Sequence, residues 1–148
     1  MKKSNSQVLF KILNYCNDIS NSANRFGNDF DTFSTDKDYQ NSICMSLMQI
    51  GELTTHLTEE FKTEFNREVD WRGCKAFRNI VAHRYNTIRK DEVWNIIQNE
   101  IPSIKEFCER TIRQFEILNA DMVEFEYDDD FNIIDDYYDY EDEQSQGR

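Results

Sequence analysis

The segment from Arg78 to Tyr85 holds the residues of this chain best suited to chemistry on a phosphate ester. It reads Arg-Asn-Ile-Val-Ala-His-Arg-Tyr, with an arginine five residues before His83 and a tyrosine two residues after it. Arginine is a permanent cation whose planar fork of N–H donors grips phosphate. Histidine is the side chain whose ordinary pKa suits proton transfer near neutral pH. Arg78 and His83 are therefore a minimal set for metal-free attack on a phosphodiester.

RNA is the substrate that such a pair of residues would need, because RNA carries its own nucleophile, the 2′-OH. His83 could act as general base or general acid, a role worth about 10²–10⁴-fold in rate. Arg78 could stabilise the negative charge that develops on the phosphoryl oxygens. The sequence shows no convincing carboxylate or His/Cys cluster for a metal ion, so we expect neither a metal nor another cofactor.

The positive charge of the chain is concentrated around this segment. The net charge is −12 overall, but residues 121–148 contain 12 acidic residues and one arginine and so carry −11 of it. Residues 67–90, in contrast, have a net charge of +5. A locally basic window keeps nucleic-acid binding possible in an acidic protein. Four of its basic residues are candidate RNA-binding residues: Arg72, Lys75, Arg84 and Arg89.

The spacing of the motif constrains how it could work. With about 100° per residue, Arg78 and His83 project roughly 140° apart on a continuous helix. They converge poorly unless the helix ends near His83 or two chains share one cleft. Asn79 lies four residues before His83, on the same helix face, and could orient the imidazole or contact phosphate.

Amphipathic helices are predicted along most of the chain, because apolar residues recur in steps of three and four. Gly27 ends the first helix, and Gly51, inside the second, indicates the close approach of another helix. With 4 Gly and 1 Pro, we expect an all-α antiparallel bundle of four to five helices. The predicted helices cover residues 5–26, 35–57 behind a capping box at Thr35–Asp38, 71–83 capped by Asp70, a helix capped by Asp91, and one that starts near Pro102 and runs to about 118.

Two regions are expected: a helical domain over residues 1–120 and an acidic tail over 121–148. The tail interleaves aromatic with acidic residues, which is typical of a disordered solubilising segment or of one that docks on a basic surface. We expect a cytoplasmic protein with no membrane span and no signal peptide. The four cysteines lack metal-site spacing and are predicted to be reduced thiols in the core: Cys16, Cys44, Cys74 and Cys108.

Three motifs resemble one known family. Residues 71–85 match W-R-x-x-x-x-x-R-N-x-x-x-H-x-Y, Ile50-Gly51-Glu52 matches I-G-E, and residues 93–102 are similar to V-W-x-I-V-x-x-D-L-P. These are motifs of the HepT-like branch of the HEPN superfamily, small all-α ribonuclease toxins of prokaryotic toxin–antitoxin pairs. The resemblance covers residues 5–118. Ala76 stands where family members often have glycine, and the acidic tail has no counterpart in the family pattern.

The resemblance implies a metal-independent endoribonuclease that works as a homodimer, with both copies of the motif lining one groove. It also implies that Tyr85 is AMPylated by a cognate minimal nucleotidyltransferase antitoxin; packing is the alternative role of this tyrosine. Two roles stay open for Glu52, a salt bridge to Arg78 or packing near the dimer seam. The alternative function is a non-catalytic HEPN module bound to a nucleotidyltransferase, in which Arg78 and His83 bind a nucleotide or phosphate without cleaving it.

Overall fold

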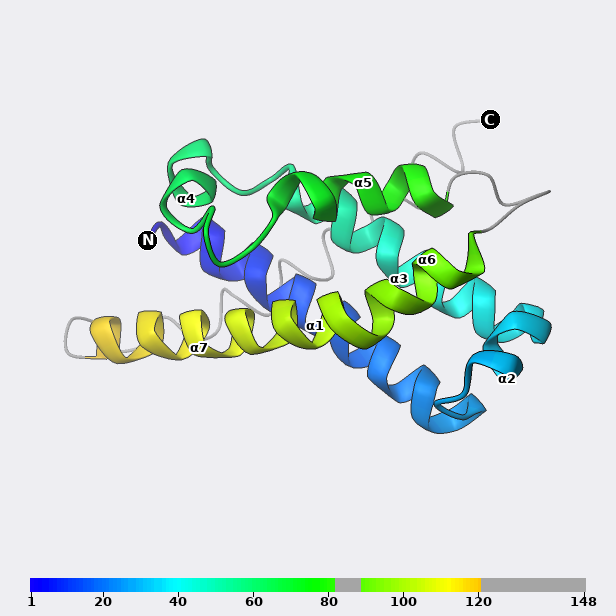
Figure 1. Ribbon diagram of the computed structural model, residues 1–148. Coiled ribbons are helices and arrows are strands. Elements are labelled where there is room, and N and C mark those ends of the chain that lie inside the picture. The colour runs from blue at the N-terminus through cyan, green and yellow to red at the C-terminus, as the bar shows by residue number, and fades with distance from the viewer. Residues whose placement is uncertain (82–88, 121–148) are drawn as a thin grey trace, which may run out of the picture. The chain divides into compact units, whose positions relative to one another are not determined.

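The computed structural model describes residues 1–81 and 89–120 (Figure 1). The predictions for His83, Arg84, Tyr85 and the acidic tail lie outside the described residues. Residues 1–115 form one compact unit, and the site discussed below belongs to this unit. The predicted domain boundary at residue 120 stays a prediction.

The described residues are helical and contain no strand, which confirms the all-α prediction. Three long helices and one long helical stretch that includes a π-helical turn, η1, correspond to the predicted bundle of four to five helices. Two six-residue helices, α2 and α4, were not predicted. The elements are α1 (Lys3–Phe26), α2 (Phe30–Thr35), α3 (Lys37–Thr54), α4 (Glu59–Glu64), α5 (Trp71–Val81), α6 (Lys90–Asn95), η1 (Ile96–Glu100) and α7 (Ile101–Ala120).

Helix α3 packs against both α1 and α5 and so lies at the centre of the compact unit. Its buried positions include Ile43, Leu47 and Ile50, each fully removed from solvent. Burial of such side chains is worth about 1.5–3 kcal/mol each. The position of α5, and of the residues it carries, is therefore set mainly by packing against α3.

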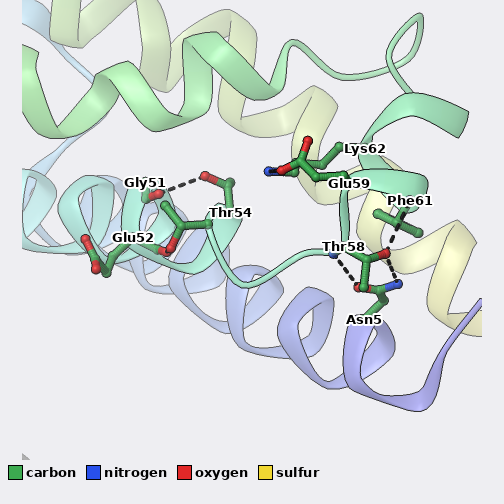
Figure 2. Close-up of polar contacts among 9 residues, drawn as sticks. Asn5, Gly51, Glu52, Thr54, Thr58, Glu59, Phe61 and Lys62 are labelled. Atoms are coloured by element: carbon green, nitrogen blue, oxygen red, sulfur yellow. Dashed lines mark hydrogen bonds and ion pairs between the residues drawn. The ribbon is translucent and has the colours of Figure 1, made fainter.

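Helices α1 and α3 run antiparallel (Figure 1), and polar contacts hold α1 at both ends, one to α3 and one to the segment that follows α3. At one end the hydroxyl oxygens of Ser22 and Ser42 lie 2.7 Å apart. At the other, Asn5 is 2% exposed and donates from Nδ2 to Thr58 Oγ1 at 3.0 Å. Its Oδ1 accepts from the Thr58 backbone N–H, also at 3.0 Å (Figure 2). Because both ends of this buried amide are paired, its desolvation is offset, and the start of α1 is tied to the segment that follows α3.

All four cysteines are buried and none forms a disulfide, as predicted for core thiols. Burial raises the pKa of Cys16 and of Cys74 to about 12. It also raises the pKa of Cys108. The reactive thiolate is therefore suppressed at these three positions near neutral pH, and they act as small apolar side chains.

The predicted capping box at Thr35–Asp38 is wrong. Asp36 caps α3, and its side chain accepts a hydrogen bond from the Tyr39 backbone N–H at 3.0 Å. Thr35 is instead the last residue of α2, which Asp29 caps through the Thr32 N–H. Because Thr35 belongs to α2, it cannot also be the N-cap of α3.

The predicted N-cap of the helix after residue 90, Asp91, is also wrong. Arg89 is the N-cap residue of α6, and Asp91 lies inside the first turn. Pro102 stands in the first turn of α7, as expected, but α6, η1 and α7 follow one another without a break. In η1 the Ile101 N–H bonds the Ile96 carbonyl, five residues back. Since proline lacks an N–H and its ring clashes with the carbonyl four residues before it, a wider turn ahead of Pro102 accommodates it.

Candidate functional site

The candidate site is built on α5, an 11-residue helix with one buried and one exposed face. Asp70 caps the helix, with its Oδ1 accepting from the Gly73 N–H at 3.0 Å, as predicted. The buried face recurs in steps of three and four and packs into the core: Trp71, Cys74, Phe77 and Val81. The exposed positions include four of the candidate site residues: Arg72, Lys75, Arg78 and Asn79. The amphipathic pattern therefore presents these polar side chains to solvent.

Gly51 brings α3 unusually close to the part of α5 that carries Arg78. A Cβ atom at this position would lie 3.1 Å from the Cys74 carbonyl oxygen and 3.5 Å from the Arg78 nitrogen. The Gly51 carbonyl accepts from Thr54 Oγ1 at 2.7 Å, a contact drawn in Figure 2. The close approach predicted from a mid-helix glycine is confirmed, and the two backbones meet next to the candidate phosphate-binding arginine.

Glu52, the neighbour of Gly51, forms an ion pair with Arg78. The Arg78 Nη1 lies 3.1 Å from Glu52 Oε2, with side-chain exposures of 63% and 46%. Of the two roles that stayed open for Glu52, the structure contains the salt bridge. The C-terminal half of α5 thus carries Arg78 and Asn79, and Glu52 faces Arg78 from α3. Helix α5 is described up to Val81, two residues before His83.

The other predicted RNA-binding residues that the structure describes lie on two different helices or at their ends. Arg72 and Lys75 are exposed on α5, on the N-terminal side of Arg78. Arg89 is exposed at the start of α6, and its Nη1 lies 3.4 Å from Glu92 Oε2. Its positive charge is therefore partly offset by a local partner.

Glu59, at the start of α4, belongs to a local ion pair outside the candidate site. Its Oε1 lies 2.8 Å from Lys62 Nζ, one helical turn further along the same helix (Figure 2). The hydrogen bond and the charge of Lys62 lower the pKa of Glu59. The carboxylate is exposed and paired within its own helix.

Metal-binding and membrane-spanning features were searched for in residues 1–81 and 89–120. Within them, no group of three or more His, Cys, Asp or Glu side chains could hold a metal ion. In the same part of the chain, no helix is long and apolar enough to cross a bilayer.

This chain belongs to the family described as Ribonuclease HepT-like, which it matches over residues 12–111. The membership confirms the resemblance, the HEPN-type helical fold and the enzyme class, a ribonuclease. A candidate RNase of Methanocaldococcus jannaschii is 32% identical over 115 residues, which cover 78% of this chain and 93% of that relative. The probable ribonuclease HepT of Thermococcus cleftensis is 29% identical over 76 residues, 51% of this chain and 68% of that protein. No solved structure matches the chain significantly.

Proposed function

We propose that this chain is a metal-independent endoribonuclease that cleaves RNA by attack of a substrate 2′-OH on the adjacent phosphate. The observation that carries this proposal is the exposed Arg78, which pairs with Glu52 where α3 and α5 pack together and lies five residues ahead of His83. A permanent cation at that place is suited to bind and stabilise a phosphoryl group. Family membership supports RNA as the substrate.

The proposed reaction needs two proton transfers and one stabilised charge. A base removes the 2′-OH proton, the 2′-oxygen forms a bond to phosphorus, and the bond from phosphorus to the 5′-oxygen breaks. An acid protonates the leaving 5′-oxygen, so the products are a 2′,3′-cyclic phosphate and a 5′-hydroxyl. His83 performs one of the proton transfers, and Arg78 neutralises the additional charge on the phosphoryl oxygens.

The test of this function uses paired substrates and a chelator. We expect the purified protein to cleave a single-stranded RNA in excess EDTA and to leave 2′,3′-cyclic phosphate ends, detected by mass spectrometry. The same oligonucleotide with a 2′-deoxy sugar at the cleaved position should resist, because the nucleophile is gone. Loss of activity in EDTA, or cleavage of the 2′-deoxy substrate at that position, would contradict the mechanism.

We propose that the active form is a homodimer in which two copies of the motif share one groove. Arg78 and His83 project roughly 140° apart on a continuous helix, and a second copy would supply the second histidine for the other proton transfer. Sedimentation of the active protein should give twice the mass of the 17.8 kDa chain. A monomer with full activity would exclude the shared groove.

We propose that the protein is the toxin of a pair with a cognate minimal nucleotidyltransferase, which silences it by AMPylating Tyr85. Tyr85 lies seven residues after Arg78 in the sequence. Phosphate groups attached there would compete with RNA for the cations of the motif and repel the substrate backbone.

Replacing Tyr85 by phenylalanine should therefore preserve RNA cleavage and abolish neutralisation. The measurement is RNase activity, with intact-protein mass, after incubation with the nucleotidyltransferase and ATP. The wild-type protein should gain one or more AMP units and lose activity, whereas the Tyr85→Phe variant should do neither. A partner that still silences the variant would show that modification of Tyr85 is not the control mechanism.

The remaining assignments concern the ends of the chain and its compartment. We propose that residues 1–120 carry the activity and that the tail of residues 121–148 is dispensable for cleavage. A chain truncated after Ala120 that folds but no longer cleaves RNA would contradict this.

We also propose that the protein is cytoplasmic. Four buried cysteines without a disulfide fit the reducing environment of the cytoplasm. Disulfide-linked species in freshly lysed cells would argue against this compartment.

A further inference from the structure

We propose that Glu52 is a positioning residue for Arg78: its carboxylate holds one corner of the guanidinium and leaves the other N–H donors directed to a substrate phosphate. The inference rests on the proposed function, because the orientation of Arg78 matters for catalysis only if Arg78 binds the scissile phosphate. It assigns Glu52 a role that acts through Arg78 and not through contact with RNA.

The form of the contact supports positioning. Glu52 and Arg78 meet through one pair of atoms, Oε2 and Nη1, at 3.1 Å. A guanidinium offers five N–H donors in a planar fork, and a carboxylate that faces it squarely takes two of them. A contact through Nη1 alone restrains one corner of the guanidinium and leaves donors for a second anion.

The two residues also lie on helices that pack closely against each other. Glu52 follows Gly51, whose missing side chain lets α3 approach the backbone nitrogen of Arg78. The Gly51 carbonyl is bonded by Thr54 Oγ1 at 2.7 Å, so the last turn of α3 is tied together at this point. Both ends of the ion pair therefore lie on packed helices, and their separation is set by the α3–α5 contact.

The exposure of the pair indicates that its contribution is not stability. The Arg78 and Glu52 side chains are 63% and 46% exposed, and ion pairs with such access to water contribute little to folding. A long arginine side chain, however, loses much rotamer freedom when it binds a ligand. Holding Arg78 in place before RNA binds reduces that loss of rotamer freedom. It also places the positive guanidinium where negative charge develops on the phosphoryl oxygens in the transition state.

Two substitutions at Glu52 separate the hydrogen bond from the charge. Glu52→Gln keeps an oxygen acceptor for Arg78 Nη1 and removes a negative charge near the phosphate site. We expect kcat to stay within about 3-fold of the wild type and KM to fall. Glu52→Ala removes the acceptor as well, and we expect kcat to fall about 10-fold or more, since misplaced catalytic groups are costly.

A second ion pair provides the matched control. Arg110 Nη2 lies 2.8 Å from Glu68 Oε2, with exposures of 47% and 48%. The pair resembles Glu52–Arg78 in type and exposure, but neither of its residues is assigned a part in the site. The variants Glu68→Gln and Glu68→Ala should leave both kcat and KM unchanged.

Nuclear magnetic resonance of the Arg78 guanidinium provides a readout that does not depend on RNA cleavage. Rotation about the Nε–Cζ bond should be slow in the wild type and in Glu52→Gln, and fast in Glu52→Ala. If the wild type does not cleave RNA, the proposed function fails, while this measurement still decides whether Glu52 orders Arg78.

The kinetic and spectroscopic results together can overturn the proposal. Equal guanidinium rotation in the wild type and Glu52→Ala would show that Glu52 does not hold Arg78. An unchanged kcat in Glu52→Ala would show that the order is catalytically irrelevant. Equal loss of kcat in Glu52→Gln and Glu52→Ala would assign the effect to charge and not to positioning.

Discussion

Replacing Arg78 by alanine should lower the rate of RNA cleavage by about 10²–10³-fold, the range seen when one donor to a developing oxyanion is removed. Arg78 is exposed and makes one surface ion pair, so the free energy of unfolding should change by less than about 1 kcal/mol. The measurement is single-turnover cleavage of a defined RNA, with urea unfolding of the same preparation. A loss of cleavage without a loss of stability would place Arg78 in the catalytic machinery.

Two further variants make this result interpretable. Arg110→Ala removes a partly exposed arginine from the Glu68–Arg110 ion pair and should leave cleavage unchanged. His83→Ala removes the proposed proton-transfer group and should cost about 10²–10⁴-fold. A wild type that binds RNA or a nucleotide without cleaving it, with binding lost in the Arg78 and His83 variants, would instead favour the non-catalytic HEPN module.

Replacing Gly51 by leucine should lower both stability and activity. A Cβ at this position already approaches the Cys74 carbonyl oxygen to 3.1 Å, and a backbone atom cannot rotate away as a side chain can. Overpacking of this kind costs about 1–3 kcal/mol. Because the strain is relieved only by moving α5 away from α3, Arg78 should lose its contact with Glu52, and the cleavage rate of the folded protein should fall.

Two glycine variants separate the cost in stability from the displacement of Arg78. Gly51→Ala gains about 1 kcal/mol of helix propensity, which offsets part of the tight contact, so its effect should be smaller than that of leucine. Gly27→Ala places a Cβ at a φ of 109°, with open space around it. It should destabilise the protein by about 1–2 kcal/mol through backbone strain alone and preserve the activity of folded molecules. A Gly51→Leu variant with wild-type stability would show that α3 and α5 do not need this contact.

The ion pairs of Arg78 and Arg89 show why the basic window of the sequence overstates the positive charge at the site. Residues 67–90 carry a net charge of +5 in the sequence. In the folded chain Arg78 is paired with Glu52, and Arg89 is paired with Glu92. Both carboxylates lie outside the window, and each offsets part of the charge of one of its arginines.

Local features of the sequence predicted the long helices and several of their ends. The apolar spacing of α1 and α5 depends only on the helical period, and Asp70 and Gly27 act on the turns beside them. The same reasoning failed where elements compete for the same residues. Thr35 could not cap α3, because it already ends α2. The six-residue helices α2 and α4 are too short to show a period.

The sequence by itself determined the family, the all-α class and which residues are candidates for the chemistry. These depend on residue type and on spacing along one chain. The sequence left the role of Glu52 open, since Glu52 and Arg78 are separated by 26 positions. Only the tertiary structure showed that the two side chains form a salt bridge. The absence of a side chain at Gly51 lets two helix backbones approach, and this packing, which no local pattern encodes, places the carboxylate of Glu52 on one corner of Arg78.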